Sequence, residues 1–422
     1  MSRSIENEPD VVRIDDFASP VFPPDAAEVM EAAAPFAESL ELGVDAICGQ
    51  ASAEVGLDDF GSNSFRAPMR AALDGFRDDV SISPMGHISV HTLFTQLARN
   101  RLLIADMLKR HPEIHDIAIT APIIVAGLPR TGTTHLHNLL SADPALRSLP
   151  YWESLEPVPL PGDVPGPGGE DPRLERTGVA VDFTNAALPL FRRMHEMTVD
   201  HRHEEIQLLA IDFSTMLIET MAPMPSWRDR YLATDQTPHY EYLRTVLQVL
   251  TFLRGGERWV LKSPQHLEQF GALMTVFPDA TVVVTHRDPV AVTASMATML
   301  AYTSRMQLAQ VDPVLIGHYW MNRLHTMLAT AMSERDLLPA DRSMDVRFNE
   351  FMADDLGTVA RIYELAGQPL DDAARAGHAA YIDGHRRNRF GSVTYDLADF
   401  DIDADECRSG FADYIERFGL NR

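Results

Sequence analysis

The segment IIVAGLPRTGTTHL, residues 123–136, contains the residue types that bind an anion. An apolar run ends at Gly127, and a turn of small hydroxyl residues then leads into a stretch with helical spacing. Unpaired amides at the start of a helix attract negative charge, and glycine lets the backbone approach a ligand closely. An arginine adds a fixed cation. The segment therefore predicts a phosphate-binding turn formed by Arg130, Thr131, Gly132, Thr133 and Thr134.

This turn differs from the loop that binds a magnesium-bound triphosphate. That loop has a lysine directly after its last glycine, whereas here Thr133 follows Gly132 and the cation precedes the turn. A phosphotransferase of the P-loop class stays open as an alternative, although its lysine is missing. An ordinary turn with a threonine N-cap is the structural alternative.

The stretch GLPRTGTTHLHNLL resembles the 5′-phosphosulfate-binding loop of sulfotransferases that use 3′-phosphoadenosine-5′-phosphosulfate (PAPS), whose pattern is Pro-[Lys/Arg]-[Ser/Thr]-Gly-Thr-Thr. The resemblance runs from about residue 90 to the C-terminus, and LKSPQH, RDP and YDLADFDID point to the bacterial, mycobacterial-type branch. It implies in-line transfer of the sulfuryl group from PAPS to a hydroxyl or amine of a small acceptor. The family needs no metal, and the sequence has no ligand cluster with zinc spacing.

The resemblance also assigns residues to the nucleotide. Arg287 in THRDPVAVTASM would bind the 3′-phosphate together with Ser295, which lies about two helical turns further on and hence on the same helix face. A structural Arg–Asp pair is the alternative for Arg287. Arg386 and Arg387 in GHRRNRFGS would cover the same phosphate, unless they belong to a solvated basic loop. Phe348 would stack on adenine, although it could equally be a core residue.

The same resemblance assigns the catalytic groups. Negative charge develops on the bridging and sulfuryl oxygens, so the site needs cations placed in advance. Arg130 and Lys262 are the candidates, and a solvated strand-end charge is the alternative for Lys262. For the base that accepts the acceptor's proton, His266 is preferred, with Glu205 in reserve beside Glu204 in HRHEEIQ. Both could instead be structural residues at the start of helices.

The elements that must position these residues can be read from the periodicity. Apolar segments at 123–127, 258–262, within 277–289 and at 343–348 predict strands, and helical patterns cover 25–47, 90–111 and the stretch after the turn. Such alternation predicts an α/β fold, a central parallel sheet flanked by helices with a P-loop-like nucleotide site and extra helical segments. We expect residues 1–89 to form a helical N-terminal extension and 90–422 the sulfotransferase domain, with an insertion at 157–253 that shapes the acceptor pocket.

Composition narrows the partners. The chain has 422 residues and a formal net charge of −25, which disfavours binding of nucleic acid or anionic lipid by bulk attraction. No apolar run approaches the length of a membrane span or a signal peptide, and the two cysteines fit a reducing cytoplasm. Methionines within 173–253 favour a small, apolar acceptor, or else belong to the core. A non-catalytic nucleotide-binding module stays open as an alternative, and the oligomeric state cannot be read.

Overall fold

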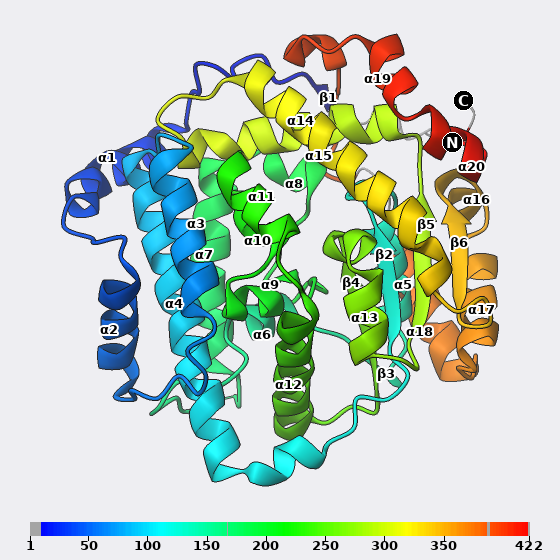
Figure 1. Cartoon of the computed structure of the whole chain (residues 1–422), viewed down its shortest axis with the longest axis horizontal. Helices are drawn as coiled ribbons and strands as arrows, with labels where there is room; N and C mark the ends of the chain where they lie inside the picture. The colour runs from blue at the N-terminus through cyan, green and yellow to red at the C-terminus, as the bar shows by residue number, and fades with distance from the viewer. Residues whose placement is uncertain (1–9, 167, 386–388, 421–422) are drawn as a thin grey trace, which may run out of the picture.

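The structure, a computed structural model, describes residues 10–166, 168–385 and 389–420. Its centre is a parallel sheet with the strand order β3-β4-β2-β5-β6 (Figure 1). The strands are β2 (Ile123–Gly127), β3 (Leu146–Arg147), β4 (Arg258–Ser263), β5 (Thr281–His286) and β6 (Ser343–Arg347). This confirms the predicted parallel sheet and its four main strands. β2, β4 and β5 are buried on both faces, apart from the first residue of β4, whereas the edge strand β6 is partly exposed.

Side chains of the central strand alternate between two hydrophobic clusters, as the two-residue period of a strand requires. Ile123 and Val125 pack with α5 (Thr133–Ser141), α17 (Asp355–Ala366) and α18 (Asp372–Gly384). Ile124 and Ala126 face the larger cluster, which includes residues of α12 (Thr237–Arg254), α13 (Phe270–Val276) and α15 (Pro313–Glu334). The sheet is therefore the middle of three layers.

Further helices surround these layers. They are α1 (Pro24–Ala37), α2 (Val44–Val55), α3 (Arg66–Asp78), α4 (Pro84–Arg110), α6 (Tyr151–Leu155), α7 (Pro172–Ala187), α8 (Phe191–Met194), α9 (Ile206–Leu209), α10 (Met216–Glu219), α11 (Pro225–Leu232), α14 (Pro289–Gln307), α16 (Phe348–Ala353), α19 (Ala404–Gly410) and α20 (Ala412–Phe418). Short 3-10 turns are η1 (Pro112–Asp116), η2 (Ala210–Asp212), η3 (Pro264–Glu268), η4 (Arg335–Leu337) and η5 (Leu397–Phe400).

The N-terminal part of the chain shares the core of the rest. Ile47 in α2 and Met69 in α3 belong to the same buried cluster as Val284 of β5. The helix predicted across 25–47 is wrong as a single element, because α1 ends at Ala37 and α2 begins only after Gly43 in an extended conformation. A second, two-stranded sheet joins β1 (Val11–Val12) in parallel to β7 (Ser392–Val393).

Two features bear on the expectations from composition. Among the described residues, no helix is both long enough and apolar enough to cross a bilayer. Cys48 and Cys407 are buried and form no disulfide.

Candidate active site

A cleft of about 940 Å³ opens where β2 and β5 end. One wall is the turn between β2 and α5, and the opposite wall is the segment that runs from α8 to α9. The cleft-facing members of the predicted site are Arg130, Gly132, Thr133, Thr134, Arg287 and Phe348. The opposite wall lies within the expected 157–253 insertion.

The turn after β2 has an unusual backbone. Arg130 and Gly132 both have a positive φ, of 71° and 88°, and α5 begins directly afterwards at Thr133. The first amides of this nine-residue helix have no partner within the helix, so they can bind an anion in the cleft. Thr131 is only 1% exposed and turns inward, donating to the carbonyl of Leu128 at 2.6 Å. Thr131 therefore shapes the turn, while Thr133 and Thr134 face the cleft.

Two arginines meet beside this turn. Arg287 donates to the carbonyl oxygen of Arg130 at 2.6 Å, and its guanidinium lies 4.2 Å above the ring of Phe348. Burial and the nearby charge of Arg130 lower the pKa of Arg287, which still stays protonated. Two cations held this close favour an anion between or above them.

The side chain of Arg130 extends away from the start of α5. It donates to the hydroxyl of Ser295 at 2.9 Å, to the carbonyl of Met194 and to the hydroxyl of Tyr395 at 3.2 Å. Ser295 is 3% exposed and lies next to the cleft without lining it. Predicted residues 130, 287 and 295 are thus brought together. Arg386 and Arg387 lie outside the described residues.

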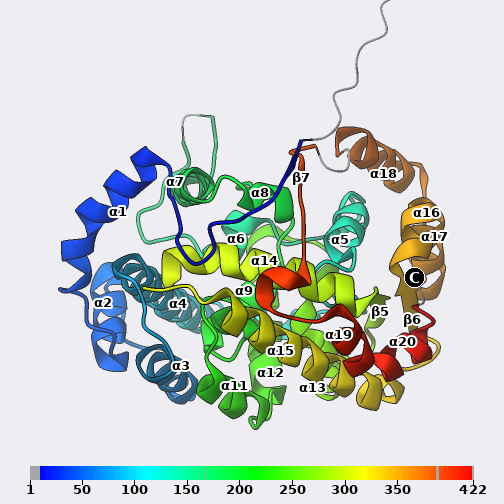
Figure 2. The same ribbon diagram turned by 90° about the horizontal axis from the view of Figure 1, so that it is seen from above.

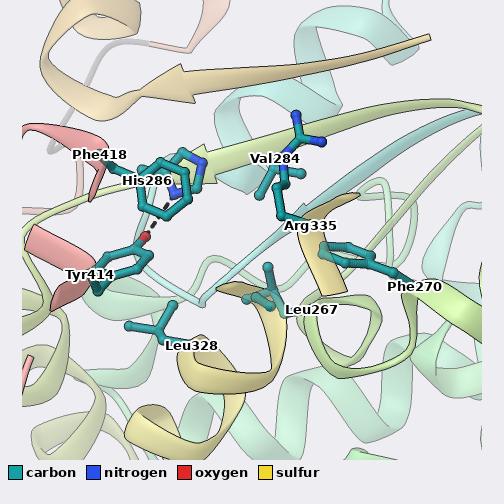
Figure 3. Close-up of a pocket in the computed structure, with 9 residues that line it drawn as sticks. Leu267, Phe270, Val284, His286, Leu328, Arg335, Tyr414 and Phe418 are labelled. Atoms are coloured by element: carbon teal, nitrogen blue, oxygen red, sulfur yellow. Dashed lines mark hydrogen bonds between the residues drawn. The ribbon is translucent and has the colours of Figure 1, made fainter. Parts of the chain in front are cut away.

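The end of β5 that precedes Arg287 is held by contacts of His286, which lines a small cavity. The cavity lining also includes Tyr414 and Phe418 of α20, which surround the ring of His286 (Figure 3). The ring nitrogens of His286 lie 2.8 Å from the hydroxyl of Tyr414 and 2.9 Å from the carboxylate of Asp345. Burial opposes ionisation of Asp345, but hydrogen bonds from His286 and Arg335 lower its pKa to about 2.

Lys262 lies at the end of β4 and is 2% exposed. Its register with Val125 places it on the α5 face of the sheet, and its ammonium group donates to Glu204, which lines the cleft. β3 pairs only with the first two residues of β4, so the amide of Lys262 is free to donate to Glu205 at 2.6 Å. Lys262 is thus placed at the boundary between the core and the cleft.

The two residues predicted as bases form a closed pair instead. His266 is 0% exposed and Glu205 is 1% exposed, and neither lines the cleft. A ring nitrogen of His266 lies 2.5 Å from the Glu205 carboxylate, and the other lies 2.8 Å from the hydroxyl of Tyr240. Burial would raise the pKa of Glu205, but the hydrogen bond from His266 brings it below the ordinary value. Every strong acceptor or donor of this pair is therefore already engaged.

The cleft wall also contains further polar residues, of which the sequence analysis named only Glu204. His195, Asp200, His201 and Glu204 all lie in the wall between α8 and α9. Burial, together with the neighbouring cations, lowers the pKa of His195 to about 3, so its ring is neutral near pH 7. The stretch HRHEE was the available signal, since five titratable residues in a row are unusual in a packed segment. Among the described residues, no group of three or more side chains could hold a metal ion.

Comparison with known proteins gives consistent results. A model of the sulfotransferase family matches residues 122–372. The crystal structure of sulfotransferase STF1 from Mycobacterium tuberculosis H37Rv is 31% identical, with a TM-score of 0.77 over 88% of this chain and 98% of that one. Sulfotransferase STF9 from Mycobacterium avium is 27% identical, with a TM-score of 0.79 over 89% and 97%. No curated protein matches the chain.

Proposed function

The chain belongs to the sulfotransferase family and transfers a sulfuryl group, and on that premise we propose that PAPS is its donor and that the cleft binds it. The phosphotransferase and binding-module alternatives are therefore set aside. The acceptor is a small molecule with a hydroxyl or amine. The second product is 3′-phosphoadenosine-5′-phosphate.

One observation carries this proposal. The amides that open α5, the hydroxyls of Thr133 and Thr134, and the paired arginines Arg130 and Arg287 all converge on the same cleft. A doubly phosphorylated nucleotide has two separate anionic ends, and this cleft offers two adjoining groups of donors. The start of α5 suits the 5′-phosphosulfate, and Arg287 with Ser295 suits the 3′-phosphate. Phe348 beneath Arg287 is available to an adenine ring.

Transfer requires positive charge where the bridging oxygen departs. We assign that role to Lys262, because its ammonium group contacts a carboxylate that lines the cleft. Arg130 assists from the turn. In the step itself, the acceptor oxygen forms a bond to sulfur, the bond between sulfur and the bridging oxygen breaks, and the leaving phosphate keeps the electron pair.

The proton of the acceptor needs a base, and we propose Glu204 in place of His266 or Glu205. Glu204 lines the cleft and touches Lys262, so its carboxylate stands beside the group that is transferred. His266 and Glu205 instead position Lys262, because Glu205 accepts from the Lys262 amide and His266 holds Glu205. They support the strand end without touching a reactant.

The acceptor is better described as polar than as apolar. Of the methionines that favoured an apolar acceptor, Met216 and Met224 are buried in the main core, and Met194 is buried as well but also lines the cleft. The wall nearest Glu204 presents histidine, aspartate and arginine side chains. An acceptor hydroxyl with polar neighbours fits this wall.

Direct titration tests the proposal. Isothermal titration with 3′-phosphoadenosine-5′-phosphate is expected to give saturable binding, and Arg287→Ala to weaken it at least tenfold, as loss of a bidentate phosphate contact does. Arg66→Ala is a matched control, because Arg66 pairs with Asp45 at 2.9 Å and does not line the cleft. Absence of binding by the parent protein, or equal affinity in the Arg287 variant, would contradict the proposal.

A further inference from the structure

The first described residues of the chain run beside a segment near its C-terminus. Val11 pairs with Ser392 and Val12 with Val393 in a parallel bridge, so that β1 and β7 form a small sheet above α8 (Figure 2). The amide of Ser392 donates to Asp10 at 3.0 Å, and the amide of Thr394 donates to Val12 at 2.9 Å. We call residues 10–17 the N-terminal strap.

The segment that pairs with the strap contributes to the cleft on both sides of β7. Arg389, Phe390 and Gly391 line the cleft just before the strand. Tyr395 follows it and accepts a hydrogen bond from Arg130. Gly391 has a φ of 84°, and a Cβ there would lie 2.6 Å from the carbonyl of Asp10. The strap and the cleft-lining segment therefore pack too closely for any other residue at this position.

Arg193 joins the strap to both other segments. From α8 it donates to the carbonyl of Asp10 at 3.0 Å and to the Asp10 carboxylate at 2.7 Å. The same guanidinium reaches the carbonyl of Ser392 at 3.5 Å. The side chain of Arg193 is 15% exposed, whereas that of Asp10 is 73% exposed. One residue thus ties α8, β1 and β7 together.

The strap is fixed at its other end, independently of the cleft. Asp16 accepts two hydrogen bonds from Arg305, at 2.8 and 3.1 Å, and the Arg305 side chain is 3% exposed. The ring of Phe17 packs on Phe400 with the centroids 5.6 Å apart. These contacts hold residues 16 and 17 against α14 and η5. The C-terminal end of the strap is therefore fixed in place.

The consequence concerns Arg130. Of its three partners, Met194 belongs to α8 and Tyr395 follows β7, and Arg193 joins these two segments through Asp10. If that joint is lost, the segments that carry Met194 and Tyr395 lose one of the contacts that hold them beside Arg130. Binding of the nucleotide must then order them, and the ordering entropy weakens the affinity.

We propose that the N-terminal strap is a positioning part of the nucleotide site, with Asp10 and Arg193 as the positioning residues. This inference rests on the proposed function, because it takes the ligand to be the doubly phosphorylated nucleotide. Neither residue takes part in the transfer step. The side chain of Arg193 also lines the cleft, whereas Asp10 does not, so Asp10 separates positioning from direct contact with the nucleotide. Their role is to keep α8 and the segment around β7 in the arrangement that binds the nucleotide.

The test compares Arg193→Gln and Asp10→Asn with the parent and with Arg66→Gln as the N-terminal control. We expect the Kd for 3′-phosphoadenosine-5′-phosphate and the KM for PAPS to rise about tenfold in both variants, with kcat within about twofold. The double variant should be no weaker than either single variant, because the two residues act through one joint. Arg66→Gln should match the parent.

Three outcomes would overturn the inference. They are an unchanged Kd in Arg193→Gln, a loss confined to kcat, or a lower melting temperature with unchanged nucleotide affinity. The affinity of the parent separates this question from the proposed function. If the parent binds the nucleotide and the variants bind equally well, only the inference fails, whereas a parent that binds none overturns both.

Discussion

Lys262 and Glu204 form an ion pair at the edge of the cleft, which Glu204 lines. The lysine side chain is 3% exposed and the glutamate side chain 20% exposed. The pair links the end of β4 to the polar wall that follows α8. An incoming sulfuryl donor offers the ammonium group a new anionic partner. Glu204 would then be released beside the acceptor, which is the arrangement that a general base requires.

Glu204→Gln should lower kcat by about 10²- to 10⁴-fold, the usual contribution of a general base, because an amide cannot accept the acceptor's proton. The affinity for 3′-phosphoadenosine-5′-phosphate should stay close to that of the parent, which titration measures. Asp200→Asn, in the same wall, is the matched control and should keep most of the activity. Turnover near the parent level in Glu204→Gln would rule out this base.

His266→Asn should act on stability more than on chemistry. Removal of the ring takes the partner from one oxygen of the buried Glu205 carboxylate, while the other oxygen still accepts from the Lys262 amide, so the free energy of unfolding should fall by about 2–4 kcal/mol. Activity per folded molecule should decline by about tenfold or less. Chemical denaturation and measurement of kcat together distinguish a structural role of His266 from a role as the base. A fall in kcat of more than about 10²-fold with unchanged stability would restore His266 as the base.

Arg287→Lys should not rescue Arg287→Ala. A lysine keeps the charge but loses the fork that contacts the Arg130 carbonyl and that we propose to contact a phosphate at the same time. We expect the lysine variant to recover less than half of the lost binding free energy, measured by titration at two salt concentrations. Full recovery would indicate that only net charge matters at this position.

Acid should destabilise the protein through His137, which is fully buried on α5. Burial and the charge of Lys262 lower the pKa of His137 to about 3, so between about pH 6.5 and 3 the unfolded chain binds more protons than the folded one. The stabilisation is complete above pH 6.5 and is lost as the pH falls. His137→Gln should reduce the slope of unfolding free energy against pH by up to about 1.4 kcal/mol per unit. An unchanged slope would contradict this assignment.

The turn after β2 and the strands were predictable because their signals are local. A continuous apolar run that ends in a glycine-bearing turn specifies both the strand and the start of α5. Arg287 could be placed for the same reason, since it directly follows β5. The position of each of these residues is set by the strand that it follows and by the common edge at which parallel strands end.

The base and the strap were not predictable, for different reasons. Glu204 and Glu205 are neighbours in the sequence, and only packing decides that one faces the cleft while the other turns to His266. The strap depends on contacts between residues nearly the whole chain apart, such as Arg13 with Asp399, 386 positions away. No period or motif marks such a contact in advance.

The parallel bridge between β1 and β7 also constrains the order of assembly. Tyr395 and Gly391 reach their places only when the last thirty or so residues meet the first twenty, because Asp10 and Val12 supply the acceptors for that bridge. A folding chain therefore forms the turn after β2 from local contacts, whereas the cleft-lining segment before β7 must wait for the strap to pair with that strand. The cleft is complete only once those two distant segments have met.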